Sequence, residues 1–127
     1  MSIARLKRNL LNKLINARID LDAYLQLRKA KGYMTVSESD ELRDNLFDLC
    51  TEMRTQGAQL STLPEPKERE ALHNAAEAMV IAAVSLMSGR HDCPQFVAVD
   101  ADKLERCLAV LTTSIQQLNA NASHTSA

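Results

Sequence analysis

The chain has 127 residues, a length that suits one domain, and its 46% hydrophobic and 24% charged residues are typical of a globular protein rather than a disordered one. Aromatic residues make up only 3% and tryptophan is absent, so the core must consist of aliphatic side chains and methionine, which favours helices over strands. The net charge of −1 gives the whole molecule no strong attraction to nucleic acids or membranes.

The first predicted helix runs from about Ser2 to Lys31 and has a wide apolar face. Two neighbouring rows recur every three or four residues, namely Ile3, Leu6, Leu10, Leu14, Ala17, Leu21 and Tyr24, and beside them Leu11, Ile15 and Ile19. Gly32 is suited to the position just after a helix, and Lys29 and Lys31 suit the negative end of the helix dipole. A second copy of the chain could cover this face, so a homodimer through the first helix is predicted.

Charge is distributed unevenly along the chain. Residues 1–31 hold eight basic and two acidic side chains, a balance of +6, and the remainder holds seven basic and fourteen acidic ones, a balance of −7. This asymmetry indicates either an anionic partner or a basic helix that packs beside acidic ones. Arg5, Lys7, Arg8 and Lys13 point in different directions around the helix, and no helix-turn-helix is evident. A DNA-binding regulator that uses the basic first helix is therefore an alternative that the sequence does not favour.

The second predicted helix spans about Ser39 to Gln59. Thr35, Ser37 and Ser39 could each cap its start, since their side chains can accept a hydrogen bond from the first helical turn. Residues 61–66 form the clearest break, because Pro64 and Pro66 cannot continue a helix.

The third predicted helix runs from Pro66 to about Ser88 and contains the most apolar stretch of the chain, Ala78–Met87. Its apolar residues point in nearly every direction, which is typical of a helix buried on all sides, and it is too short to span a bilayer. We expect Ile81→Asp or Val84→Asp to abolish cooperative unfolding. The charged residues 67–70 are expected to be exposed.

The fourth predicted helix follows Asp100, a good N-cap, and ends near Leu118. Before it, Phe96–Val99 has the composition of a short extended segment, but no partner strand is evident. Residues 119–127 are small and polar and predict a disordered tail. The predicted fold class is all-α, with residues 1–118 forming a single-domain antiparallel four-helix bundle and residues 119–127 a flexible tail.

No catalytic, cofactor-binding or metal-binding residues are assigned, and an enzyme is not predicted. There is no phosphate-binding glycine loop and no nucleophile elbow. His91, Asp92 and Cys93 are ligand-type residues in a row, but three consecutive residues cannot readily converge on one ion, so a structural loop is favoured over a metal site. Cys50 and Cys107 lie on apolar helical faces and are predicted to be core residues.

The sequence also bears on location and ligands. An odd number of cysteines (Cys50, Cys93 and Cys107) without a secretory signal predicts reduced thiols in the cytoplasm. A further alternative is a small-molecule-sensing bundle with a pocket near aromatic residues and methionine. The residues proposed for that pocket are Tyr24, Tyr33, Met34 and Phe96.

Two stretches of the chain resemble a known family. Residues 10–45 contain LRKAKGYM and VSES, and residues 86–118 contain HDCP and ADKLE. On these runs the chain closely resembles the enterobacterial biofilm formation regulatory proteins of the BssR family.

This resemblance implies a cytoplasmic, non-enzymatic regulator that represses biofilm formation. It further implies a link to catabolite repression, to stress responses, and to indole and autoinducer signalling by a cyclic-AMP-dependent route. It implies no site residues. The expected partner is a protein or a second copy of the chain, without a cofactor and without a membrane.

Overall fold

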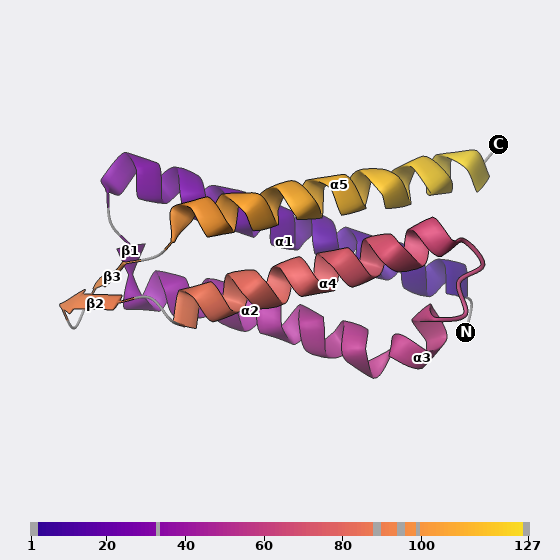
Figure 1. Cartoon of the computed structure of the whole chain (residues 1–127), viewed down its shortest axis with the longest axis horizontal. Coiled ribbons are helices and arrows are strands. Elements are labelled where there is room, and N and C mark those ends of the chain that lie inside the picture. Colours follow the sequence, from indigo (N-terminus) through magenta and orange to yellow (C-terminus); the bar gives the residue numbers. More distant parts are fainter. Residues whose placement is uncertain (1–2, 33, 88–89, 94–95, 99, 126–127) are drawn as a thin grey trace.

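The computed structural model describes residues 3–32, 34–87, 90–93, 96–98 and 100–125. The chain is predominantly helical, as predicted. Its described helices are α1 (Ile3–Lys31), α2 (Val36–Thr55), α3 (Gly57–Leu60), α4 (Pro66–Met87) and α5 (Ala101–Thr125). The four longer helices, α1, α2, α4 and α5, lie alongside one another, and successive ones run in opposite directions (Figure 1).

Helix boundaries in the first half of the chain follow the capping residues. α1 ends at Lys31, and Gly32 follows with a φ of 81°, the left-handed conformation that glycine adopts without strain. α2 begins at Val36, earlier than expected, because Thr35 rather than Ser39 is its N-cap. Thr35 and Glu38 form a capping box in which each side chain bonds the other residue's backbone N–H. The predicted second helix is divided at Gln56 into α2 and the short α3.

The later helices begin where the sequence predicts. α4 starts at Pro66, where the missing N–H of proline costs nothing, and the Asp100 carboxylate accepts a hydrogen bond of 3.1 Å from the Lys103 backbone at the start of α5. α5 ends at Thr125 rather than near Leu118. Residues 119–125 contain neither proline nor glycine, so no residue type there interrupts the helical backbone.

A small sheet closes one end of the helical body. Its strands are β1 (Met34–Thr35), β2 (Arg90–Cys93) and β3 (Phe96–Ala98), in the order β1-β3-β2 with antiparallel pairing. Figure 1 shows the sheet beyond the ends of α2 and α4. The expectation that the extended segment at Phe96 has no partner strand is therefore wrong. The pairing of β3 with β1 joins segments far apart in the sequence, which local patterns cannot reveal.

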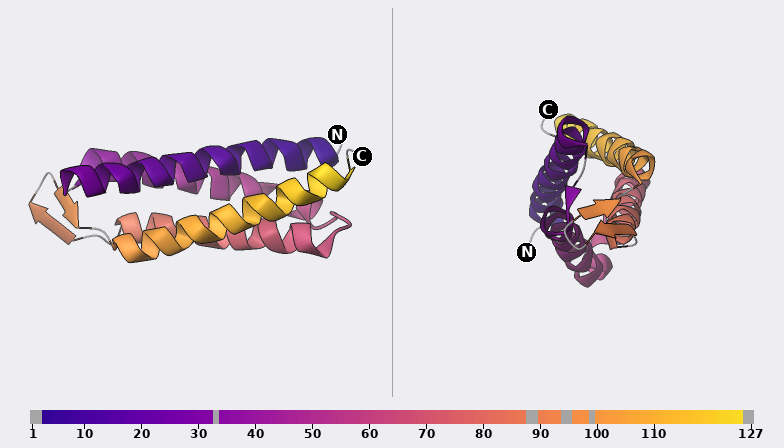
Figure 2. Two further views of the ribbon diagram at one scale, coloured as in Figure 1. Left: turned by 90° about the horizontal axis from the view of Figure 1, so that it is seen from above. Right: turned by 90° about the vertical axis from the view of Figure 1, so that its left-hand side faces the viewer.

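The hydrophobic core lies between the four long helices, which Figure 2 shows end-on as the corners of a rough square. Leucines supply most of it, and alanines let α4 approach its neighbours α2 and α5 closely. The alanines of α4 that face the core are Ala71, Ala75, Ala78, Ala82 and Ala83. Glu68, which we expected to be exposed, is buried because it forms an ion pair with Lys7 of α1.

The prediction that α4 is buried on all sides is wrong. Ile81 is 41% exposed and Val84 is 46% exposed, because α4 has helical neighbours on its inner and lateral sides only. Met79 and Ala82, in the same stretch, are fully buried. In a helix that is apolar in every direction, the exposed side is decided by the positions of the other helices. Within the described part of the chain, no helix is long and apolar enough to cross a membrane.

Candidate protein-binding surface

The two cysteines whose side chains the structure describes, Cys50 and Cys107, are buried core residues, as predicted. The Cys50 thiol donates a weak hydrogen bond to the Ala76 carbonyl oxygen, with an Sγ–O distance of 3.7 Å. Burial raises the pKa of both thiols above the ordinary value, because desolvation disfavours the thiolate. These two side chains therefore fill space and are poor nucleophiles.

His91, Asp92 and Cys93 lie on β2 rather than in a loop, and their side chains fall outside the described residues. Among the described residues, no group of three or more histidine, cysteine, aspartate or glutamate side chains is arranged to hold a metal ion. The absence of a metal at these three residues stays a prediction.

The basic side chains of α1 are largely engaged inside the molecule. Ion pairs join α1 to acidic residues that follow it in the chain: Lys7–Glu68, Lys13–Glu52, Lys29–Glu105 and Lys31–Glu38. Arg18 donates a hydrogen bond of 2.7 Å to Thr112 of α5. The charge asymmetry of the sequence thus has an internal explanation, because the basic helix packs beside acidic residues.

The apolar face of α1 is mostly used within the chain as well. Eight of its residues are buried in the helical core, among them Leu10, Leu14 and Leu21 with no exposed surface. Ile19 and Leu27 are the large hydrophobic residues of α1 that stay exposed, at 54% and 41%. A homodimer through α1 stays a prediction, but little of the predicted apolar face is left to support one.

An outward apolar surface runs along α4 and α5. Ile81 and Val84 of α4 and Val110 of α5 are 40–46% exposed, and a groove of about 410 Å³ separates the two helices. The groove is lined by Asn74, Glu77, Ala78, Ile81, Lys103, Arg106, Cys107 and Val110. We call this groove, together with Val84, the α4–α5 face. Solvent-exposed clusters of large aliphatic residues rimmed by charges often mark interaction sites.

Charges of opposite sign lie on the two sides of this face. Glu77 is on α4, whereas Lys103 and Arg106 are on α5. Oε2 of Glu77 lies 3.6 Å from Nε2 of His73 on the same helix, and both side chains are well exposed. Among the described residues, Lys103 and Arg106 form no ion pair with a carboxylate of their own chain. Their charges are therefore available to a molecule that docks on the face.

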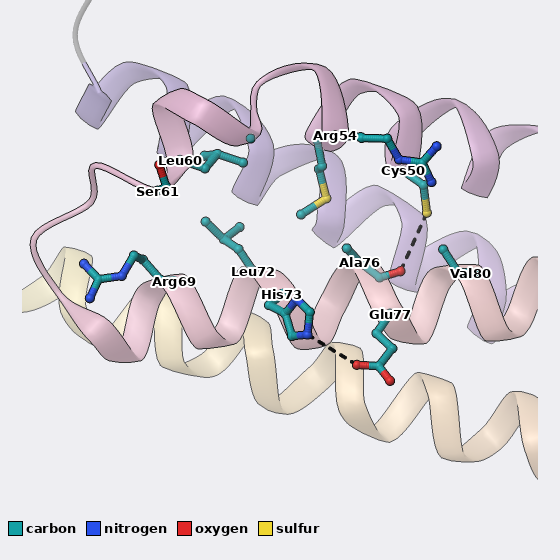
Figure 3. Close-up of a pocket in the computed structure, with 12 residues that line it drawn as sticks. Cys50, Arg54, Leu60, Ser61, Arg69, Leu72, His73, Ala76, Glu77 and Val80 are labelled. Carbon is teal, nitrogen blue, oxygen red and sulfur yellow. Dashed lines mark hydrogen bonds and ion pairs between the residues drawn. The ribbon is translucent and has the colours of Figure 1, made fainter.

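A second apolar hollow lies on the other side of α4, against α2 and α3. It has a volume of about 540 Å³, and Leu60 of α3 and Leu72 of α4 point toward it (Figure 3). Cys50 and Ala76 meet at its floor, and the Arg69 guanidinium turns away to the carbonyl oxygen of Leu63. Gly57, two residues after the end of α2 at Thr55, lines this hollow and carries no side chain to fill it.

The pocket predicted near the aromatic residues is smaller. Tyr24 and Met34 line a hollow of about 280 Å³ together with Leu27 and Glu38. The Tyr24 hydroxyl is already bonded to Ser39 at 2.8 Å, so it has a partner within the chain. The side chains of the other two aromatic residues proposed for this pocket lie outside the described residues.

Sequence patterns alone miss the α4–α5 face. The apolar stripe expected on α5 consists of Leu104, Cys107, Leu108, Leu111, Ile115 and Leu118. Val110 lies off this stripe, and an apolar residue outside the core stripe is the one signal that could have indicated a second apolar surface. On α4 no such signal exists, because both the inner and the outer side are apolar.

Comparison with known proteins identifies the relatives of the chain. Biofilm regulator BssR of Escherichia coli strain K12 is 55% identical over 122 residues, which cover 96% of each chain. The BssR proteins of Escherichia coli O157:H7 and Shigella flexneri match to the same extent. No solved structure matches the chain. Residues 1–126 match the family of biofilm formation proteins YliH/bssR, and the chain therefore belongs to that family.

Proposed function

We propose that this chain is a non-enzymatic cytoplasmic regulator that acts on biofilm formation by binding a protein at the α4–α5 face. Membership of the biofilm formation family supports the process. The observation that carries the mode of action is the outward apolar surface formed by Ile81, Val84 and Val110. Both described cysteine thiols are buried, so neither is presented to a substrate at the surface.

The energetics of the face suit a protein partner. Fully burying one large aliphatic side chain contributes about 2 kcal/mol, and these three residues keep somewhat less than half of their surface exposed in the free chain. Covering them would therefore contribute roughly 1 kcal/mol each, before the groove between the helices is filled. The charged rim at Glu77, Lys103 and Arg106 would orient the partner and select it.

The proposal also includes the direction of regulation and the pathways involved. The regulator represses biofilm formation and is linked to catabolite repression, stress responses, and indole and autoinducer signalling. The support for these details is the resemblance to the BssR family, and they concern pathways rather than residues.

The proposal is tested by returning the wild-type chain or a variant to cells that lack the chain and measuring their biofilm mass. Cells that receive Ile81→Ser or Val110→Ser should lose regulation of biofilm formation. The variant chains should stay as abundant as the wild type, since both side chains lie at the surface. Ile19→Ser is the control, because Ile19 is also an exposed aliphatic residue, at 54%, but lies on α1. Full regulation by both face variants would contradict the proposal.

A small-molecule sensor is the second candidate, and the hollow between α2, α3 and α4 favours it. Its volume of about 540 Å³ lies within the usual range for ligand pockets, and its walls are mainly apolar. Ala76→Leu would fill the hollow from α4. A ligand that raises the melting temperature of the wild type but not of this variant would support the sensor.

A further inference from the structure

We infer that the protein that docks on the α4–α5 face is a second copy of this chain, so that the regulator is a two-fold symmetric dimer. This inference deepens the proposed function and rests on it. A two-fold interface is isologous: the same patch serves both subunits, and it must therefore carry both members of every complementary pair. The α4–α5 face meets that requirement in charge and in shape.

The charges are arranged for two-fold pairing. α4 and α5 run antiparallel to each other (Figure 1). Of the charged residues that line the groove, the acid Glu77 lies on α4 and the bases Lys103 and Arg106 lie on α5. A two-fold axis that lies in the plane of the interface, parallel to the two helices and running along the groove, places α4 of one copy over α5 of the other. Glu77 of each copy then faces the basic pair of its partner, and the same contact forms twice. The two cations have no carboxylate partner among the described residues of their own chain, so dimerisation would give them one.

The shape is also self-complementary. Ile81 and Val110 project at the edges of an apolar groove of about 410 Å³ that Ala78 and Cys107 also line. In the two-fold arrangement the two grooves face each other, so Ile81 and Val110 of both copies line one shared apolar space and lose exposed surface there. The short Ala78 side chain at the base of the groove leaves room for them.

The surface around the face is large enough for a dimer. α4 has 22 residues and is therefore about 33 Å long, and the outer sides of two helices lying about 10 Å apart make a surface about 20 Å wide, with the α4–α5 face at its centre. A stable dimer buries about 800 Å² of each subunit, which is roughly a tenth of the 7619 Å² of accessible surface here. The outer sides of the two helices along their full length reach that order of area.

α1 is the competing surface. Ile19 and Leu27 are exposed there, but four lysines of α1 already pair with carboxylates of the same chain. The hollows that α1 lines with α2 are smaller, about 280 Å³ and 240 Å³, and acidic side chains line both of them. The α4–α5 face therefore explains a dimer better than the basic first helix does.

Sedimentation velocity of the full chain tests the inference, because the mass is 14.1 kDa for one copy and twice that for a dimer. The wild type should sediment as a dimer. Glu77→Lys, which makes the charged rim entirely basic, and Lys103→Glu with Arg106→Glu, which makes it entirely acidic, should each shift the chain to monomer. An equimolar mixture of the two variants should restore the dimer as a heterodimer. Glu70→Lys, an exposed change of the same charge on α4 outside the groove, should leave the dimer intact.

Each other outcome overturns the inference. A wild type that stays monomeric would exclude the second copy, as would a dimer that both rim variants leave unchanged. If the mixture stays monomeric although each variant keeps its helical circular dichroism spectrum, the two-fold pairing of charges is wrong. This result can be told apart from failure of the proposed function. If the chain is monomeric but its biofilm regulation still depends on Ile81, the α4–α5 face is still the binding surface, and its partner is a different protein rather than a second copy.

Discussion

Lys7 of α1 and Glu68 of α4 form an ion pair in which the carboxylate side chain is only 4% exposed and the ammonium side chain 13% exposed. The pair ties the start of the first helix to the start of the helix that carries the α4–α5 face. A carboxylate can be buried to this extent only with a partner, since an isolated charge is strongly disfavoured away from water.

Lys7→Met should therefore lower the free energy of unfolding by about 3 kcal/mol, because it leaves the buried Glu68 charge uncompensated. Lys7→Met combined with Glu68→Met should recover most of this loss. Urea denaturation measures both. Lys13→Met is the matched control: Lys13 pairs with Glu52 in a more exposed setting and should cost less than about 1 kcal/mol. Equal losses for Lys7→Met and Lys13→Met would contradict the account.

Ile81→Asp should retain a cooperative thermal transition, contrary to the expectation from sequence alone. The side chain is 41% exposed, so the carboxylate stays in water and the cost should be about 1 kcal/mol or less. Met79→Asp, two residues away and fully buried, should abolish the transition. Circular dichroism melts at low protein concentration, where dimer formation does not add stability, measure the difference. Loss of the transition in both variants would show that the outer side of α4 is covered in the folded monomer.

Stability should fall in acid partly through Glu38. A hydrogen bond from the Lys31 ammonium group at 2.8 Å, helped by one from the Thr35 backbone N–H at 3.0 Å, lowers the pKa of Glu38 from 4.5 to about 2. The ionised carboxylate is therefore favoured in the folded state, and its contribution is complete above pH 4.5 and is lost between pH 4.5 and pH 2.

Glu38→Gln should thus be less stable than the wild type at neutral pH, with a difference that disappears as the pH falls to 2. Urea titrations across this range measure it. Glu41→Gln, an exposed change on the same helix, is the control and should show no such trend. A difference between Glu38→Gln and wild type that is independent of pH would refute the assignment.

Tyr24 and Ser39 should behave as a coupled pair. Their hydroxyl oxygens lie 2.8 Å apart in a buried position between α1 and α2, and burial raises the pKa of Tyr24. Ser39→Ala and Tyr24→Phe should each cost about 1 kcal/mol, and the double variant little more than either one. Strict additivity in this cycle would show that the hydrogen bond contributes nothing. Ser37→Ala, at an exposed position in α2, serves as the control.

Local chemistry determines what could be predicted of the fold. Gly32, Pro66 and Asp100 each act on the backbone beside them, and the helix boundaries that they predict agree with the structure. The small sheet and the burial of Glu68 depend on partners distant in the sequence, so no local pattern could indicate them.

The candidate site was less predictable than the fold. Ile81 and Met79 are both large apolar residues in one uninterrupted stretch, and nothing in their surroundings in the sequence tells which of them faces water. The groove between α4 and α5 arises only when two helices meet. Its charges are ordinary surface residues in the sequence, and Lys103 and Arg106 acquire significance because they face Glu77 across an apolar groove.

Co-expression of the two oppositely charged rim variants in cells that lack the chain tests the central claim most directly, with biofilm mass as the readout. Glu77→Lys alone and the Lys103→Glu, Arg106→Glu variant alone should each fail to regulate biofilm formation, whereas the two together should restore regulation. Regulation by either variant alone at the wild-type level, or no restoration when both folded chains are present, would contradict the claim that the chain acts through paired α4–α5 faces.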